Sequence, residues 1–133
     1  MSSCAAVSDV QVLSLSPLAH TWVLDLDGTI LRHNGYLGPN GDSLLEGAAE
    51  FMSSIPPDDL VIFVTSRPST LREMTETFLV RHRIRYNHLV FDAPYGERIL
   101  INDHKPSGLR TAIAIDHTRD AAFDVVFEID ASK

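Results

Sequence analysis

The sequence has a single cysteine, Cys4, among its 133 residues. One cysteine cannot form an internal disulfide, so a reducing compartment is expected. Basic charge is also scarce: 11 Lys and Arg residues stand against 18 Asp and Glu residues, a formal net charge of −7. An acidic chain without a basic block is a poor partner for nucleic acid or for an anionic membrane surface.

Long apolar runs are missing as well. No stretch reaches the length needed to span a bilayer, and residues 1–19 lack the basic segment and apolar core of a signal peptide. We therefore expect a cytoplasmic protein with no membrane partner. What remains is a composition ordinary for a globular protein, 44% hydrophobic and 22% charged.

The length suits one domain. We expect this domain at residues 20–133, preceded by an extension at residues 1–19 that is either an unstructured lead or an added edge strand. Within the domain, apolar runs predict strands at residues 20–26, 60–64, 88–91, 98–101, 111–115 and 125–129.

Helical patterns alternate with these runs. Residues 43–55 and 68–79 have apolar side chains at helical spacing, and each segment starts with the hydroxyl-to-glutamate spacing of a capping box. Alternating strands and helices predict an α/β fold in three layers, built on a parallel sheet with right-handed crossovers. Residues 32–42 are rich in turn formers and too few for an inserted domain, so a loop is expected there.

Polar residues follow three of the predicted strands: Asp25-Leu26-Asp27-Gly28-Thr29, Thr65-Ser66-Arg67 and Asn102-Asp103. Because parallel strands end at one edge of a sheet, these groups are expected to converge. Carboxylates suit Mg²⁺, while a hydroxyl and an arginine fork suit phosphoryl oxygens. Each group also has a structural alternative: the acids could form Asx turns, and Thr65 could satisfy local backbone groups.

These residues resemble motifs of a known family. Asp25-Leu26-Asp27-Gly28-Thr29 matches the DxDGT first motif of the haloacid dehalogenase-like (HAD) phosphohydrolase superfamily. Val64-Thr65 resembles its second motif, and Ile101-Asn102-Asp103 resembles its acidic fourth motif. Residues 96–109 are similar to small capless members associated with bacterial surface-polysaccharide biosynthesis. The resemblance covers residues 20–118 and implies a Rossmann-like core without a cap domain.

The resemblance also implies a role for each motif residue. Asp25 would attack phosphorus and form an aspartyl-phosphate, and Asp27 would protonate the leaving oxygen and then activate water. Mg²⁺ would be held by Asp25, the main-chain carbonyl of Asp27, and Asp103, while Thr65 would bind the phosphoryl group. The other phosphate-binding positions are Gly28, Thr29, Ser66, Arg67 and Arg98.

The chain departs from the family at two points. The third-motif lysine often precedes a proline, but the corresponding pair here is Ala93-Pro94. Arg98 and Lys105 are the candidates to replace it, and Lys105 is favoured because it is nearer to the end of the predicted strand. Asn102 stands where related sequences often carry a second acid, so a metal would lose one charged ligand.

The resulting hypothesis is a Mg²⁺-dependent phosphatase that hydrolyses a small phosphorylated metabolite, by resemblance a sugar phosphate. A nucleotide or polynucleotide 3′-phosphatase is an alternative, because Thr65-Ser66-Arg67 also resembles that branch, although the net charge opposes a polymer. The missing lysine favours a third candidate, a catalytically weak phosphate-binding regulatory module. Without a cap, residues 32–41 would form a flap over an open site, which admits a bulky substrate or needs a second copy or another protein to close it.

Overall fold

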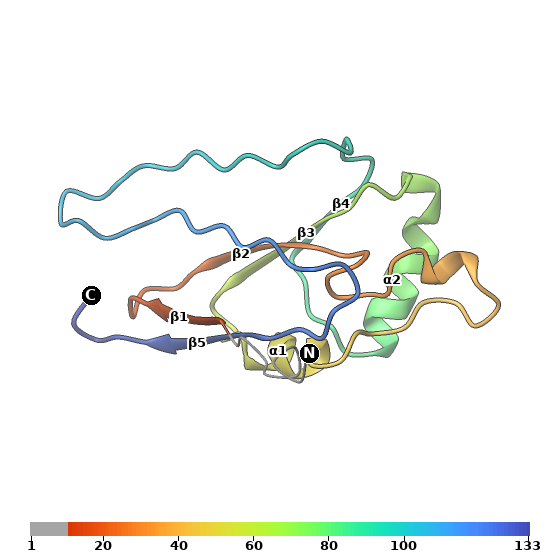
Figure 1. The fold of residues 1–133 in the computed structure, drawn as a ribbon, viewed down its shortest axis with the longest axis horizontal. Coiled ribbons are helices and arrows are strands. Elements are labelled where there is room, and N and C mark those ends of the chain that lie inside the picture. Colours follow the sequence, from red (N-terminus) through yellow and green to blue (C-terminus); the bar gives the residue numbers. More distant parts are fainter. Residues whose placement is uncertain (1–10) are drawn as a thin grey trace, which may run out of the picture.

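Parallel β-sheets form the framework of the protein (Figure 1). The computed structural model describes residues 11–133. β2 (Thr21–Asp25), β3 (Leu60–Val64) and β4 (His88–Val90) form a three-stranded sheet in the order β2-β3-β4, and all its pairs are parallel. The fold is therefore mixed α/β with parallel strands, as the alternating sequence patterns predict.

A second sheet uses part of the N-terminal extension. β1 (Gln11–Leu15) pairs in parallel with β5 (Val125–Ile129), and no other strand joins this pair among the described residues. The strand predicted at residues 125–129 is confirmed, and an edge strand is the correct alternative for residues 11–15. The prediction concerning Cys4 lies outside the described residues.

The first helix, α1 (Ala48–Ser54), is shorter than the predicted residues 43–55. Gly47 has a φ of 82°, which is outside the right-handed helical range. A helix that began at residue 43 could therefore not continue through Gly47, and α1 begins after it. Leu44 instead forms an isolated antiparallel bridge with Leu31. The loop between them contains a short 3₁₀ turn, η2 (Gly35–Leu37).

The second helical segment starts with a 3₁₀ turn, η3 (Ser69–Leu71), and continues as α2 (Arg72–Arg81). Pro68 immediately precedes the turn in an extended conformation. Neither α1 nor the η3–α2 segment has a side-chain capping hydrogen bond, so both predicted capping boxes are wrong. The η3 start is instead supported by Asp92, whose carboxylate accepts a hydrogen bond from the Ser69 N–H at 3.1 Å.

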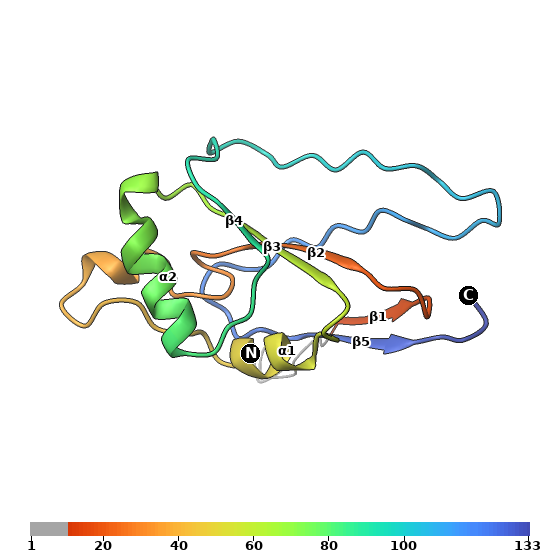
Figure 2. The same ribbon diagram turned by 180° about the vertical axis from the view of Figure 1, so that it is seen from behind.

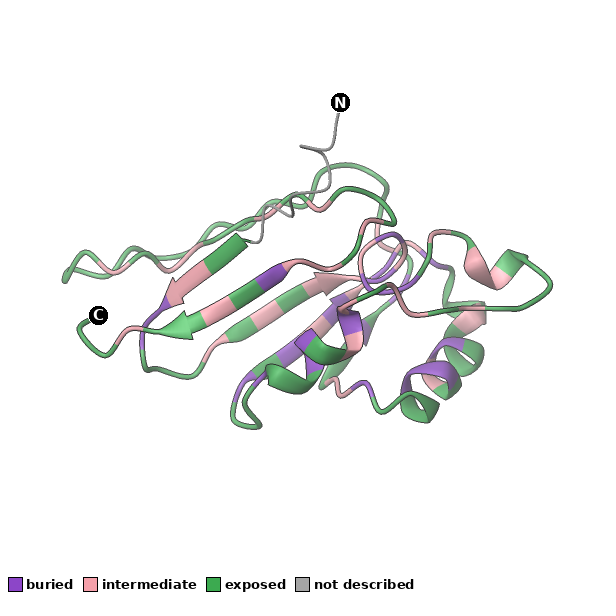
Figure 3. Ribbon diagram, turned by 60° about the horizontal axis from the view of Figure 1, so that its bottom comes forward, coloured by how far each residue is buried: buried purple, intermediate pink, exposed green. Residues whose placement is uncertain are grey.

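Most buried residues come from the β2-β3-β4 sheet, from the turn after β2 and from both α-helices, and Val125 of β5 joins them (Figure 3). Val61 and Phe63 of the central strand β3 are fully buried, and Phe51 of α1 packs edge-on against Trp22 of β2 with ring centroids 5.4 Å apart. The parallel pairing of β2 and β3 places Asp25 opposite Val64. The carboxyl ends of the two strands are therefore fixed side by side.

Residues 91–124 contain no helix or strand, and the predicted strands at 98–101 and 111–115 are wrong. Residues 95–117, called the arm below, extend outward after β4, turn, and come back toward β5 (Figures 1 and 2). Ile99 is 81% exposed and Ile101 is 90% exposed. Apolar β-branched sequence favours an extended chain, but a strand also needs a neighbouring backbone to take its hydrogen bonds. In the arm, the Asn102 amide instead donates to the Thr111 carbonyl at 2.9 Å.

The helices in the described part of the chain are short, and none is both long and apolar enough to cross a membrane.

Candidate active site

A tight turn follows β2 and carries the residues of the predicted first motif. The Leu26 carbonyl accepts hydrogen bonds from three successive backbone N–H groups, those of Thr29, Ile30 and Leu31, at 3.2, 2.9 and 2.9 Å. Leu26, Ile30 and Leu31 are fully buried. The turn is therefore anchored in the core, and its polar residues are held at the end of the sheet.

Gly28 permits this turn. Its φ of 87° lies in the left-handed region, and a Cβ at this position would lie 3.2 Å from Cγ of Arg119. The turn brings Thr29 back to the end of the strand, where its hydroxyl donates to Oδ2 of Asp25 at 3.2 Å. The Gly-Thr pair after Asp27 therefore orients the Asp25 carboxylate.

Arg98 is the cation that the structure places at Asp25. Its Nη1 donates to Oδ1 of Asp25 at 2.9 Å and to the Val64 carbonyl at 3.0 Å. Nη2 contacts Oγ of Ser66 at 3.4 Å. The side chains of Arg98 and Asp25 are 39% and 37% exposed. A carboxylate and a guanidinium are thus accessible together at the end of β2, and the guanidinium keeps N–H groups for an incoming anion.

Thr65 and Ser66 follow β3 beside this pair. Thr65 is 1% exposed, and its hydroxyl oxygen accepts a hydrogen bond from the backbone N–H of Arg67 at 3.1 Å. Thr65 therefore does satisfy a local backbone group, while its hydroxyl proton is left to donate elsewhere. Ser66 is less buried, and its hydroxyl donates to the Pro94 carbonyl at 3.4 Å.

Arg67 lies in the interior, where it binds two carboxylates. Nε and Nη2 donate to the two oxygens of Asp27 at 2.9 and 2.8 Å, and Nη1 and Nη2 donate to the two oxygens of Asp42 at 3.1 and 2.7 Å. Nη1 also donates to Oγ1 of Thr75 at 3.0 Å, and the guanidinium carbon lies 4.5 Å from the centre of the Tyr36 ring. The five hydrogen bonds use all five N–H groups of the guanidinium. We call these five residues the Arg67 cluster.

The electrostatics of the Arg67 cluster favour the charged arginine. Burial disfavours the cation, but the hydrogen bonds and negative charges of Asp27 and Asp42 outweigh burial and raise the pKa of Arg67 above its ordinary value. The side chains of Arg67 and Asp42 are 1% and 2% exposed, whereas that of Asp27 is 17% exposed. Asp27 is thus the member of the two ion pairs that reaches solvent.

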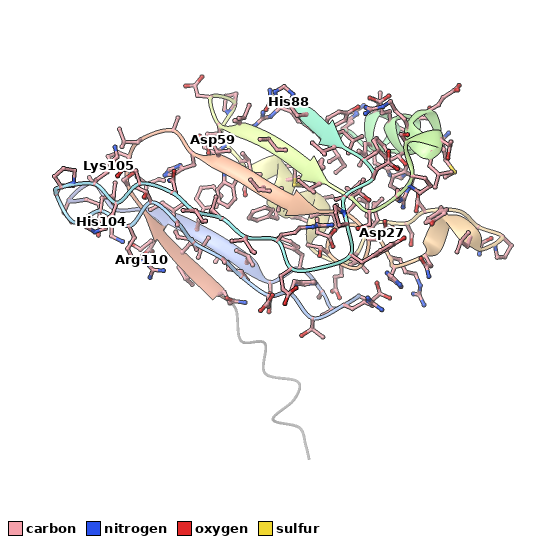
Figure 4. All side chains as sticks on the ribbon, turned by 90° about the horizontal axis from the view of Figure 1, so that it is seen from above. Asp27, Asp59, His88, His104, Lys105 and Arg110 are labelled. Atoms are coloured by element: carbon pink, nitrogen blue, oxygen red, sulfur yellow. The ribbon has the colours of Figure 1, made fainter. Side chains whose placement is uncertain are left out.

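Asp103 and Lys105 are not brought to the other predicted site residues. Figure 4 shows His104 and Lys105 at the opposite end of the molecule from Asp27. Asp103 directly precedes His104, and its backbone carbonyl accepts a hydrogen bond from the Thr111 hydroxyl across the arm. Of the three strand ends expected to converge, only those of β2 and β3 lie together.

The predicted magnesium ligands do not form a site in this arrangement. Within residues 11–133, no group of three or more His, Cys, Asp and Glu side chains could hold a metal ion. Asp25 faces Arg98, and Asp27 faces Arg67. Each carboxylate already has a cationic partner, so these side chains as arranged do not fit the metal.

Three members of the Arg67 cluster, Asp42, Tyr36 and Thr75, are not among the predicted site residues. Asp42 and Tyr36 belong to the loop predicted at residues 32–42, and Asp42 lies at its end, next to the Leu31–Leu44 bridge. Nothing in the local sequence distinguishes this aspartate from an ordinary turn former. The sequence does show that Arg67 closely follows an apolar strand. An arginine that becomes buried at such a place needs an acidic partner.

The site thus combines an accessible carboxylate beside a cation with a second carboxylate held by a buried arginine. Such a pair of carboxylates can serve as a nucleophile and as a proton donor and acceptor. No protein-family model, no curated protein and no solved structure matches the chain.

Proposed function

We propose that the protein is a HAD-like phosphatase that hydrolyses a small phosphate monoester with Asp25 as the nucleophile. The observation that carries this proposal is the Asp25–Arg98 pair, in which an accessible carboxylate and guanidinium are joined by a hydrogen bond of 2.9 Å. The pair lies at the carboxyl end of a parallel strand, where open α/β sheets bind ligands. In this proposal the three-stranded sheet belongs to a three-layer Rossmann-like core without a cap domain.

The first step is transfer of the phosphoryl group to Asp25. Arg98 exchanges its contact with Asp25 for the phosphoryl oxygens, to which a guanidinium can donate two parallel hydrogen bonds. An oxygen of Asp25 attacks phosphorus, and the bond from phosphorus to the ester oxygen breaks. Asp27 gives its proton to that leaving oxygen, so the products are an alcohol and an aspartyl-phosphate.

The second step releases phosphate. Asp27, now a carboxylate, takes a proton from a water molecule as that water attacks phosphorus. The bond from phosphorus to the Asp25 oxygen breaks, which restores the Asp25 carboxylate and yields inorganic phosphate. Thr29, which donates to Oδ2 of Asp25 at 3.2 Å, keeps the other carboxylate oxygen oriented in both steps.

The substrate class rests on the resemblance of residues 96–109 to capless HAD members, which favours a sugar phosphate. The net charge of −7 favours a small substrate over a nucleic-acid polymer. Mg²⁺ is implied by the same resemblance, but Asp25, Asp27 and Asp103 as arranged do not form its site. The proposal therefore rests on Asp25 and Arg98, and the dependence on the metal is measured separately.

A second candidate is a phosphate-binding module without significant turnover. It is favoured by the pairing of Asp25 with Arg98, because a carboxylate engaged by a guanidinium is a weaker nucleophile until the pair opens. The two candidates differ in what they require of Asp25, since binding to Arg98 does not need a nucleophile.

Phosphate release from a panel of sugar phosphates, nucleotides and 4-nitrophenyl phosphate, with and without Mg²⁺, tests the proposal. Asp25→Asn serves as the control, because it keeps the shape of the side chain and removes its nucleophilic charge. We expect turnover that the variant lacks, and the best substrate identifies the class. A folded protein that binds phosphate equally well in both forms and turns nothing over would establish the binding module instead.

A further inference from the structure

The Arg67 cluster poses a chemical problem for the proposed acid and base. Both oxygens of Asp27 accept hydrogen bonds from Arg67, at 2.9 and 2.8 Å. A proton on either oxygen of Asp27 would compete with the arginine N–H group that the same oxygen accepts. Asp27 must therefore leave at least one of these hydrogen bonds in order to act as a proton donor.

Leaving Arg67 would be costly if Asp27 were its only partner. The Arg67 side chain is 1% exposed, and a charge at such a depth is strongly destabilising when it has no partner. Asp42 changes this balance, since it accepts two hydrogen bonds from Arg67 at 2.7 and 3.1 Å and is itself 2% exposed. Arg67 thus remains paired when Asp27 moves away.

The two carboxylates differ in their exposure. Asp42 lies at the base of the 32–42 loop, where the Arg32 N–H donates to the Ser43 carbonyl at 3.0 Å and Leu31 bridges to Leu44. Asp27 is 17% exposed and lies beside the accessible Asp25, in the turn that follows β2. The buried partner is therefore Asp42, and the partner with access to a substrate is Asp27.

We propose that Asp42 is a positioning residue that compensates the buried charge of Arg67 and so frees Asp27 to donate and accept protons. This inference rests on the proposed phosphatase function. It gives the loop at residues 32–42 a role beyond that of a flap. The loop supplies a fixed counter-charge for the interior of the site.

The test uses two substrates that differ in their need for a proton donor. Phenyl phosphate has a poor leaving group that must be protonated, whereas 2,4-dinitrophenyl phosphate has a leaving group that departs as an anion. The quantity to compare is kcat/KM, because it reports the steps up to departure of the leaving group and is not affected by release of phosphate. Assays contain Mg²⁺ throughout.

Asp42→Asn keeps the shape of the side chain and removes its charge, which leaves Asp27 as the only anionic partner of Arg67. We expect kcat/KM for phenyl phosphate to fall by at least about tenfold, a part of the range that a general acid supplies. The value for 2,4-dinitrophenyl phosphate should change by less than about twofold. Asp27→Asn should show the same selectivity more strongly, and Asp42→Glu, which keeps the charge, should recover part of the loss.

Two controls separate positioning from loss of packing. Thr75→Val removes a neutral contact to Nη1 of Arg67 without changing charge, and Asp58→Asn removes an exposed carboxylate elsewhere. Neither should alter the ratio of kcat/KM for the two substrates. If Asp42→Asn slows both substrates equally, or Thr75→Val gives the same selectivity, then Asp42 has only a structural role and the inference is overturned. Absence of Asp25-dependent turnover in the unmodified protein would overturn the proposed function itself, and the inference with it.

Discussion

Arg98 donates a hydrogen bond of 2.9 Å to Asp25, a residue 73 positions earlier in the chain. The interaction joins the last residue of β2 to the start of the arm and places a cation beside the proposed nucleophile. A second hydrogen bond, from Nη1 of Arg98 to the Val64 carbonyl at 3.0 Å, fixes the guanidinium between the ends of β2 and β3. Arg98 thus lies where the proposed phosphatase needs a cation, beside the proposed nucleophile.

Arg98→Ala should therefore abolish most of the proposed activity. We expect kcat/KM to fall by about 10²-fold, the size of effect seen when one donor to the developing charge is removed. Lys105→Ala is the matched control, because Lys105 is a cation of the same arm at its distant end (Figure 4). It should change kcat/KM by less than about twofold. A larger effect from Lys105→Ala than from Arg98→Ala would show that Arg98 is not the cation of the site.

The sequence favours Lys105 over Arg98 as the cation of the site because Lys105 is near the end of a strand predicted at residues 98–101. Nearness to a strand end has meaning only if the strand forms, and Ile99 and Ile101 are exposed in the arm. The apolar runs correctly predict β2, β3, β4 and β5. Each of these runs forms a strand because it lies beside a parallel neighbour. The same composition in the arm forms no strand, and the pattern alone contains no information about which backbone is available for pairing.

The Arg67 cluster shows a similar limit for the site. The spacing of Asp25 and Asp27 correctly places both at the end of a strand, and Thr65 and Arg67 correctly follow its neighbour. That Asp27 pairs with Arg67 could not be read from the sequence, because the two are 40 residues apart. The partner Asp42 depends on how the loop folds back, which turn-forming residues do not specify.

The buried ion pairs of Arg67 predict a large effect on stability. Arg67→Ala would leave Asp42, which is 2% exposed, and Asp27 without a cation, so the free energy of unfolding should fall by about 3–5 kcal/mol. Arg98→Ala removes an ion pair whose side chains are 39% and 37% exposed, and should cost no more than about 1 kcal/mol. Urea denaturation followed by circular dichroism measures both. Equal losses for the two variants would contradict the burial of the Arg67 cluster.

Tyr86 predicts a dependence of stability on alkaline pH. Burial, the hydrogen bond from its hydroxyl to Glu76 at 3.1 Å and the charge of Glu76 raise the pKa of Tyr86 above its ordinary value, while Arg72 opposes them. A raised pKa in the folded state means that folding favours the neutral phenol. The resulting stabilisation is complete below the pKa of the unfolded chain, about 10, and is lost as the pH rises through the folded value.

Tyr86→Phe isolates this contribution from the other titrating groups. The difference in free energy of unfolding between the unmodified protein and the variant should favour the unmodified protein at pH 8 and shrink at pH 11. Urea denaturation at the two values provides the comparison. A difference that is constant with pH would show that Tyr86 titrates alike in the folded and unfolded chains.

Alanine substitutions at Gly47 and Gly41 test how closely the backbone of Phe123 approaches the start of α1. Both have positive φ, 82° and 71°, but a Cβ at Gly47 would lie 2.5 Å from the backbone oxygen of Phe123, while a Cβ at Gly41 would meet nothing within 4 Å. Gly41→Ala therefore carries only the cost of a left-handed alanine, about 1–2 kcal/mol. Gly47→Ala adds a clash with backbone, which cannot rotate away, and should cost at least about 1–3 kcal/mol more.

Chemical denaturation of the two alanine variants measures this difference directly. Phe123 is also tied to this point by a hydrogen bond from its N–H to the Glu46 carbonyl at 2.7 Å, so displacing it would loosen the segment that leads into β5. We therefore expect the Gly47→Ala variant to unfold at a lower denaturant concentration than Gly41→Ala, with the same dependence on denaturant. If the two midpoints coincide, the backbone of Phe123 does not pass over the start of α1.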